Sequence, residues 1–231
     1  MREYGQFCPI ARSSELLAER WTPIIVRNLL NGCRTFNEIR QGAPGISTAL
    51  LAQRLDALER HGVLCRVPTS TGRGATYELT EMGLALRPVL DAMGQWGARW
   101  LEIEPHDLSA AYVLFATLKL IDHDRIPAGT TVLRFALADE PDDHWMLLRR
   151  PVSELCSRSS GHVEDLVVRT DAATLVDLHL RRITYADAVR RGRLTFQGPR
   201  DLTRAFRGWF RSSPFAPFVP EASAHAGGVR P

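Results

Sequence analysis

Apolar residues recur at helical spacing through the first part of the chain and predict four helices before residue 62. The first covers about 9–19, and the second starts at Thr22, an N-cap candidate followed by proline, and ends at Gly32. The third begins with the capping-box sequence 35–38, and the fourth runs from Ser47 to Gly62. One face of the fourth helix is polar, and the other carries the apolar residues Ile46, Leu50, Leu51, Leu55 and Leu58.

Two strand-like segments, 63–67 and 75–79, follow this fourth helix and are joined by the turn-rich stretch 68–74. A helix followed at once by a hairpin is typical of winged DNA-binding domains. In these domains the helix enters the major groove and the hairpin touches phosphate or the minor groove. This order of elements makes double-stranded DNA the predicted partner, with an ordinary solvated helix face as the alternative.

A further amphipathic segment is predicted as one helix from Thr80 to about residue 100, with Pro88 inside it at a place where proline can bend a helix. Its apolar stripe is broad and includes two tryptophans at the end of a small domain, which favours burial against a second subunit. Packing inside the same chain is the alternative. The predicted interface residues are Leu90, Met93, Trp96, Gly97 and Trp100.

The pattern changes after the charged stretch 102–105, where we expect a domain boundary. A helix is predicted at 108–120, followed by strands at 131–138, 144–149, 151–157 and 162–169. Helices at 171–180 and 184–190, a strand at 193–197 and a last helix complete this half, the last helix carrying Leu202, Phe206, Trp209 and Phe210. The expected fold class is α+β, with a mainly helical winged domain at 1–103, a domain with a smaller sheet at 106–215 and a flexible tail at 216–231.

Composition narrows the function without identifying it. The 231 residues are 45% hydrophobic, enough for two packed domains, and contain neither a signal sequence nor an uncharged apolar run long enough to span a membrane. We therefore expect a cytoplasmic protein without a membrane partner. The four cysteines form no C-x-x-C pair, and the motifs of hydrolases, metalloproteases and phosphate-binding enzymes are absent. No metal, no cofactor and no enzymatic activity are expected, and a net charge of +3 does not by itself indicate DNA.

Seven stretches of the first hundred residues carry a family pattern, namely 8–10, 20–22, 34–39, 44–47, 51–55, 58–59 and 77–83. Through them this part of the chain closely resembles the HxlR family of winged-helix regulators. The resemblance implies a symmetric homodimer, built from the first and last helices of the domain, on a roughly palindromic operator. Arg20 stands where the family commonly has lysine and keeps the positive charge. The implied DNA contacts are base readers at Thr48, Gln53 and Arg54, a wing contact at Arg73, and phosphate contacts at Thr35 and Ser47.

Cys8 matches an N-terminal cysteine that in some members of this family looks like a sensor of oxidants or electrophiles. The start of a helix and the nearby Arg12 are surroundings that favour a reactive thiolate. A regulator switched by Cys8 is therefore an alternative function, and an unreactive thiol is the simpler interpretation.

The second half resembles the sterol-carrier-protein family along 167–175 and 187–198. That fold is a sheet with helices over one face and an apolar tunnel between them, so the resemblance implies a hydrophobic small-molecule ligand or an extra packing module. The leading hypothesis is a DNA-binding repressor whose occupancy of DNA depends on this ligand. A lipid-binding or interaction module with a non-functional winged helix is a further alternative. The candidate pocket residues, each of which could equally be plain core, are Leu114, Phe115, Leu118, Leu175, Phe206 and Phe210.

Overall fold

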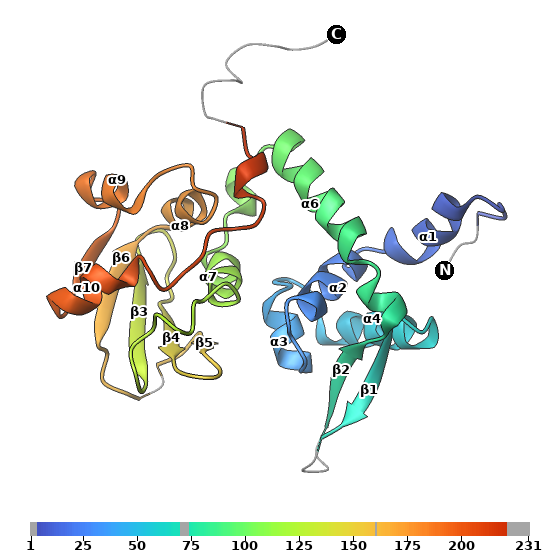
Figure 1. Cartoon of the computed structure of the whole chain (residues 1–231), viewed down its shortest axis with the longest axis horizontal. Helices are drawn as coiled ribbons and strands as arrows, with labels where there is room; N and C mark the ends of the chain where they lie inside the picture. Colours follow the sequence, from blue (N-terminus) through green and yellow to red (C-terminus); the bar gives the residue numbers. More distant parts are fainter. Residues whose placement is uncertain (1–3, 70–73, 160, 221–231) are drawn as a thin grey trace, which may run out of the picture. The chain divides into compact units, whose positions relative to one another are not determined.

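The computed structural model describes residues 4–69, 74–159 and 161–220, and the chain divides into two compact units between Gly94 and Gln95 (Figure 1). This division falls inside a helix, earlier than the boundary predicted at 103. The first unit consists of helices and a two-stranded hairpin, and the second contains a five-stranded sheet with helices. The mixed α and β content expected from the sequence is therefore present.

The helices of the first unit are α1 (Pro9–Leu17), α2 (Thr22–Leu30), α3 (Phe36–Gln41) and α4 (Thr48–Arg60). The predicted capping box forms, because the Thr35 hydroxyl accepts from the Glu38 N–H and the Glu38 carboxylate accepts from the Thr35 N–H. Ser47 caps α4 by accepting from the Leu50 N–H at 3.2 Å. Local sequence signals therefore set the starts of both helices.

The prediction of Thr22 as an N-cap is wrong. Thr22 is instead the first residue of α2 and is almost completely buried. The residue before it, Trp21, has a φ of 78° and occupies the left-handed region, which a non-glycine residue adopts only when its surroundings hold it there. The tight turn between α1 and α2 therefore forms without a side-chain cap.

A buried amide links α2 to α3. Asn28 is 1% exposed and donates from Nδ2 to the Ile39 carbonyl at 3.0 Å, while its Oδ1 accepts from Arg27 Nη2 at 3.0 Å. Arg27 also donates to the carbonyl of Gly42 at 2.6 Å. A Cβ on Gly42 would lie only 2.5 Å from Asn28 Nδ2, so this position requires glycine. These contacts fix the angle between the two helices that precede α4.

The hairpin consists of the antiparallel strands β1 (Leu64–Pro68) and β2 (Ala75–Leu79), close to the predicted bounds. The N–H of Tyr77 donates to the carbonyl of Arg34 at 2.7 Å, which attaches the hairpin to the loop before α3. After β2, Thr80 caps α5 (Glu81–Leu84). An added Cβ on Gly83 would lie 2.1 Å from the carbonyl oxygen of Val63, so only glycine allows α5 to lie this close to the hairpin.

The single helix predicted from Thr80 is two helices, because the chain turns after α5 and begins again as α6 (Arg87–Trp100). Pro88 is the second residue of α6, where its missing N–H removes no helical hydrogen bond. Proline therefore starts this helix and does not bend it.

The second unit begins with a short 3₁₀ turn, η1 (Pro105–Asp107), and α7 (Ala110–Leu118). Its sheet has the order β5-β4-β3-β6-β7, in which β3 and β6 are parallel and the other neighbours are antiparallel. The two strands predicted at 151–157 and 162–169 are shorter than expected, and the other predicted strands agree to within two residues. The strands are β3 (Thr131–Leu137), β4 (His144–Leu148), β5 (Glu154–Cys156), β6 (Leu166–Thr170) and β7 (Thr195–Gln197).

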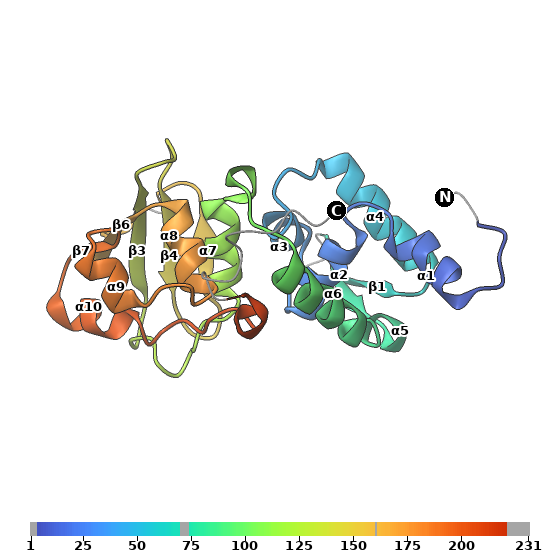
Figure 2. The same ribbon diagram turned by 90° about the horizontal axis from the view of Figure 1, so that it is seen from above.

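Helices α7, α8 (Ala172–His179), α9 (Tyr185–Arg190) and α10 (Arg200–Phe206) gather on one side of this sheet (Figure 2). Alternate strand residues face them and are buried with the apolar residues of the helices. The largest buried members of this core are Leu114, Leu133, Phe135, Met146, Leu148, Phe206 and Trp209. A sheet covered on one face leaves the core between the sheet and the helices, where a ligand cavity would form.

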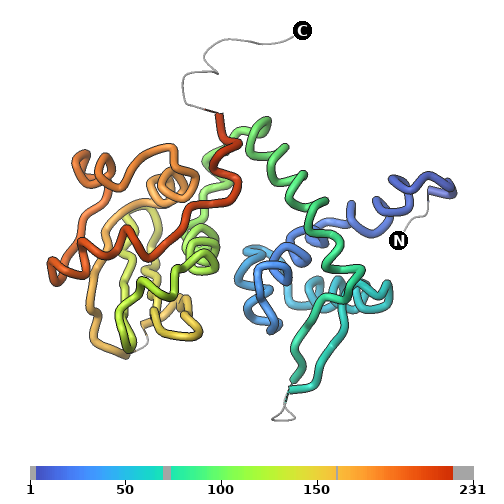
Figure 3. The backbone as a smooth tube through the Cα atoms, in the orientation of Figure 1, coloured from blue at the N-terminus to red at the C-terminus, as the bar shows by residue number. Residues whose placement is uncertain are grey.

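The last helix ends earlier than predicted, so Trp209 lies in the hydrogen-bonded turn after α10 and Phe210 begins the segment that follows. This segment returns past the ends of α7 and α8, as the tube in Figure 3 shows. Phe210 forms an antiparallel bridge with Ile121. The tail predicted to start at 216 is ordered at its start, where residues 216–218 form the 3₁₀ turn η2 (Ala216–Phe218), and residues 221–231 lie outside the described part.

No helix in the described part of the chain is both long and apolar enough to cross a membrane.

Candidate functional site

The burial of one face of α4 determines which side chains the helix presents to solvent. Leu51, Leu55 and Leu58 are completely buried. Gln53 projects from the opposite face and is exposed, and Thr48 is exposed at the first turn. Two of the three predicted base readers therefore lie on an accessible face of α4, the helix beside the hairpin in Figure 1. The other exposed members of this surface are Ala49, Asp56 and Arg60.

The two predicted phosphate contacts, Ser47 and Thr35, differ in the hydrogen bonds that their hydroxyl groups already form. Ser47 is exposed and accepts one hydrogen bond from Leu50 N–H, so its hydroxyl proton remains available to a phosphate oxygen. Both hydrogen-bond donors of Thr35 are already in use, because its hydroxyl and its N–H both donate to Glu38 Oε2, at 3.0 and 2.9 Å. An anion at Thr35 would also meet this carboxylate. The geometry favours Ser47.

Arg54 does not extend freely from α4. Its Nη2 lies 2.7 Å from Glu19 Oε2, and its Nε donates to the carbonyl of Arg20 at 3.1 Å. The side chain is only 19% exposed. Arg54 therefore joins α4 to the turn before α2, and a contact with a base would require this pair to open.

An arginine of the hairpin pairs with two carboxylates of α4. Arg66 of β1 pairs with Asp56, and its Nε lies 3.4 Å from Glu59 Oε2. The hydrogen bond to Asp56 raises the pKa of Arg66 above its ordinary value. The guanidinium also lies over the ring of Tyr77, 5.6 Å from its centroid. These pairs reduce the repulsion that two carboxylates beside a DNA phosphate would cause. The predicted wing contact, Arg73, lies outside the described residues.

The predicted stripe on α6 is split between the interior and the surface. Leu90 is buried within its own chain. Met93, Trp96 and Trp100 expose 51%, 58% and 59% of their surfaces, and Gly97 lies between them half-exposed. Large aromatic side chains at such exposure are unusual on the surface of a folded monomer. The exposed apolar residues of the first helix and the segment before it are Tyr4, Phe7 and Ile10.

The four cysteines are free thiols and form no disulfide bond. Cys8 is exposed immediately before α1, and Cys65 is exposed on β1. Cys33 is buried, and burial together with Glu154 raises the pKa of the Cys156 thiol. Within the described residues, no group of histidine, cysteine and carboxylate side chains has the arrangement of a metal site.

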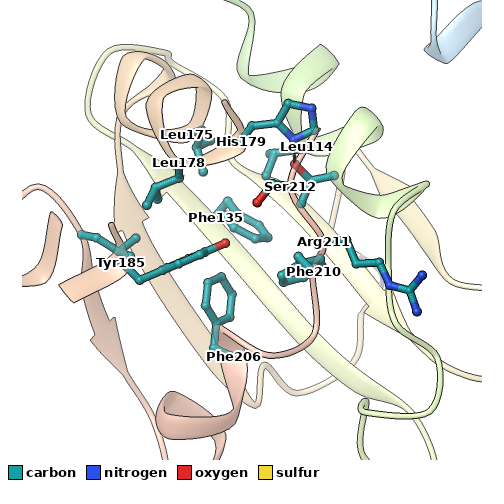
Figure 4. Close-up of a pocket in the computed structure, with 12 residues that line it drawn as sticks. Leu114, Phe135, Leu175, Leu178, His179, Tyr185, Phe206, Phe210, Arg211 and Ser212 are labelled. Atoms are coloured by element: carbon teal, nitrogen blue, oxygen red, sulfur yellow. Dashed lines mark hydrogen bonds between the residues drawn. The ribbon is translucent and has the colours of Figure 1, made fainter. Parts of the chain in front are cut away.

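The second unit contains a small cavity between the sheet and its helices (Figure 4). Four predicted pocket residues line it, namely Leu114, Leu175, Phe206 and Phe210. Phe115 and Leu118 are buried but do not line the cavity. Its volume is about 30 Å³, which is about the share of one water molecule in liquid water. The other lining residues are Thr117, Phe135, Leu178, His179, Tyr185, Leu194, Arg211 and Ser212.

Sequence reasoning missed the polar residues of this cavity. His179 is the last residue of α8, and its Nδ1 is 3.1 Å from the Thr117 hydroxyl of α7. Burial lowers the pKa of His179 to about 4, so the ring is neutral near pH 7. Burial also raises the pKa of Tyr185, the first residue of α9, to about 12. The only sequence signal for either residue was its position at the end of a capped helix.

The buried His179 predicts a specific loss of stability in acid. Its pKa is 6.5 in the unfolded chain and about 4 in the folded one, so the unfolded state binds a proton first as the pH falls. The stabilising contribution is complete above pH 6.5 and falls as the pH decreases toward 4, by about 2 kcal/mol at pH 5. His179→Asn should remove this part of the pH dependence, measured as the difference in unfolding free energy between pH 7.5 and 5.

The matched control is His106→Asn, which removes an exposed imidazole of η1 in the same unit, so that the effect of losing any histidine can be subtracted. Parallel pH curves for the parent and His179→Asn would contradict the assignment.

Comparisons with known proteins concern the first part of the chain. The HxlR-like helix-turn-helix family matches residues 16–105. The chain is 36% identical over 101 residues to the uncharacterized HTH-type transcriptional regulator YvaP of Bacillus subtilis (strain 168), covering 42% of this chain and 93% of that protein. It is 37% identical over 97 residues to the HTH-type transcriptional regulator YodB of the same strain, covering 41% of this chain and 87% of YodB.

Solved structures with sequence similarity cover the same region. The reduced form of the transcriptional regulator YodB from B. subtilis is 35% identical and has a TM-score of 0.37, over 42% of this chain and 97% of that one. The redox regulator HypR in its reduced form is 28% identical with a TM-score of 0.37, over 39% of this chain and 90% of that one.

Proposed function

The chain belongs to the HxlR-like helix-turn-helix family of transcriptional regulators, and on this basis we propose that it is a repressor that binds a palindromic operator as a homodimer. The observation that carries the proposal is the exposed polar face of α4 beside the β1–β2 hairpin. The protein acts by binding, without catalysis. An apolar small molecule in the second unit, which we propose to be a domain of sterol-carrier-protein type, alters its occupancy of DNA.

α4 contacts DNA through its first turns. Gln53 and Thr48 face the base edges, because they are exposed and lie on the side of α4 away from its buried leucines. The Ser47 hydroxyl and the N–H groups at the start of α4 receive a phosphate. Arg54 holds the helix in place through Glu19 and reaches DNA only when that pair opens.

The proposed contact of Gln53 predicts a base-specific loss of affinity. Gln53→Ala should weaken operator binding by about 1–3 kcal/mol and remove discrimination at one base pair of each half-site. The measurement is fluorescence anisotropy at fixed salt with the operator and a set of single-substitution duplexes. Gln197→Ala, an exposed glutamine of β7 in the second unit, is the control and should bind as the parent does.

The same titration separates the two roles of Arg54. If Arg54 positions α4, Arg54→Ala and Glu19→Gln should weaken binding to all duplexes alike. If Arg54 reads a base, Glu19→Gln should preserve operator discrimination and Arg54→Ala should abolish it. Full discrimination in Gln53→Ala would remove Gln53 from the proposed base contacts. Failure of the parent to prefer any duplex would favour the alternative module with a non-functional winged helix.

The proposed dimer buries the exposed stripe of α6. Trp96→Glu should place a charge in this interface and shift the protein toward monomer, because burying an unpaired carboxylate is costly. Sedimentation equilibrium measures the change, and operator affinity should fall with it since two linked half-site contacts become one. Gln95→Glu, on the other side of the same helix, is the control. A Trp96→Glu protein that remains as dimeric as the parent would exclude this face as the interface.

A switch at Cys8 is the second candidate function, favoured by the exposure of its thiol before α1. Under this alternative, Cys8→Ser should keep operator affinity but lose its response to diamide or a quinone in the anisotropy titration. Under the ligand proposal, the variant should respond to its effector as the parent does. Cys65→Ser is the control for the other exposed thiol. A parent protein whose operator affinity ignores oxidant would exclude the switch.

A further inference from the structure

The cavity of the second unit is apolar on most sides and polar at defined points. Its aromatic walls come from β3 and from the end of α10 and the segment after it, and its leucines come mainly from α7 and α8. Figure 4 shows the Tyr185 hydroxyl directed between these walls toward Phe135.

The Tyr185 hydroxyl has no hydrogen-bond partner in the described part of the chain. The ring is held edge-on against Phe206, with centroids 6.0 Å apart and an interplanar angle of 77°. Phe206 itself packs against Phe196 and Phe210 at 5.0 and 5.4 Å between ring centroids. Packing therefore fixes the position of the ring, while the hydroxyl keeps contact with solvent and is free to bond with a molecule that enters the cavity.

The polar groups that face the cavity interior carry no charge at physiological pH. Tyr185 keeps its proton because burial raises its pKa to about 12, and His179 stays neutral because burial lowers its pKa to about 4. The Thr117 hydroxyl, bonded to His179 Nδ1, is neutral as well. Arg211 is the one charged residue among those that line the cavity, and its exposed side chain pairs with Asp122 at 3.3 Å. The interior is therefore matched to a neutral polar group.

We propose that this cavity binds a small neutral molecule with an apolar ring and one hydroxyl or carbonyl oxygen, which forms a hydrogen bond with the Tyr185 hydroxyl. The inference rests on the proposed function to the extent that this molecule is the effector. It specifies the polar group of the ligand, which the resemblance to the sterol-carrier-protein family does not. A long-chain carboxylate does not match these groups, because its charge would find only neutral partners inside.

Entry of a ring requires the cavity to widen, and the segment after α10 forms one of its walls. Its backbone is held by Arg211 N–H donating to the carbonyl of Leu120 at 3.1 Å and by Ser213 N–H donating to the carbonyl of His179 at 2.9 Å. Arg181 Nε donates to the Ser212 hydroxyl at 2.7 Å. A cavity of about 30 Å³ cannot take a six-membered ring, whereas an engineered cavity of about 150 Å³ binds benzene. The ligand therefore takes the place of the half-buried Phe210 ring.

The test uses the full-length protein and three probes at pH 7.5: phenol, toluene and benzoate. Phenol and toluene differ by one hydroxyl, and benzoate adds a charge. Binding is measured by isothermal titration calorimetry and by the rise in Tm that a ligand of the folded state produces. We expect phenol to bind about tenfold more tightly than toluene, as one added hydrogen bond predicts, and benzoate to bind least.

Two variants assign this preference to the tyrosine. Tyr185→Phe removes only the hydroxyl and should make phenol and toluene equal in affinity. Tyr112→Phe removes the same atom from α7 in the same unit, at a residue that does not line the cavity, and should keep the preference. A phenol preference that survives in Tyr185→Phe, or tighter binding of benzoate than of phenol, would overturn the proposal.

Phe210→Ala provides a second test that does not depend on the tyrosine substitution. Removal of the ring should enlarge the cavity and strengthen phenol binding, with the folded state verified by circular dichroism. Failure of both the parent and Phe210→Ala to bind phenol would overturn the proposal.

A parallel titration with operator DNA separates this inference from the proposed function. Phenol binding that leaves operator affinity unchanged would support the site and contradict its role as the effector site. An effect on operator affinity without dependence on Tyr185 would contradict the site alone.

Discussion

The burial of one side of α4 is the constraint on which the rest of the first unit depends. Leu51, Leu55 and Leu58 lose all contact with water, which at about 25 cal/mol per Å² of apolar surface is the dominant stabilising contribution that this helix makes. Once that face is buried, Gln53 has to point outward. The hydrogen bond from Asn28 to the Ile39 carbonyl of α3 then sets the angle at which the bundle presents this surface.

In the second unit a cluster of aromatic rings is the constraint on which the packing of the sheet and helices depends. Phe206 contacts five other rings, including Phe135 of the sheet and Tyr185 of α9, and so it connects elements that are far apart in the sequence. Because these rings fill the space between the sheet and the helices, the cavity that remains is small and its polar groups have fixed directions. The same packing that stabilises the unit therefore limits the size and shape of this cavity.

The elements of both units were largely predictable, because caps and periodicity are local properties. The capping box at Thr35 and the cap at Ser47 both form as expected. The predictions that were wrong depended on contacts between elements. The turn at Trp21 is held in the left-handed region without a side-chain cap, and the last helix ends at Phe206 because the following segment bridges to Ile121 instead.

The same distinction between local patterns and contacts between elements applies to the candidate sites. The sequence by itself determined that α4 has a polar face carrying Gln53 and that α6 has an apolar stripe, since each follows from the period of a single helix. Only the tertiary structure decided that Arg54 is paired with Glu19 and that Tyr185 and His179 share one cavity. These contacts join residues from different elements, and their distances depend on how the helices and the sheet pack, which no local pattern of residues specifies.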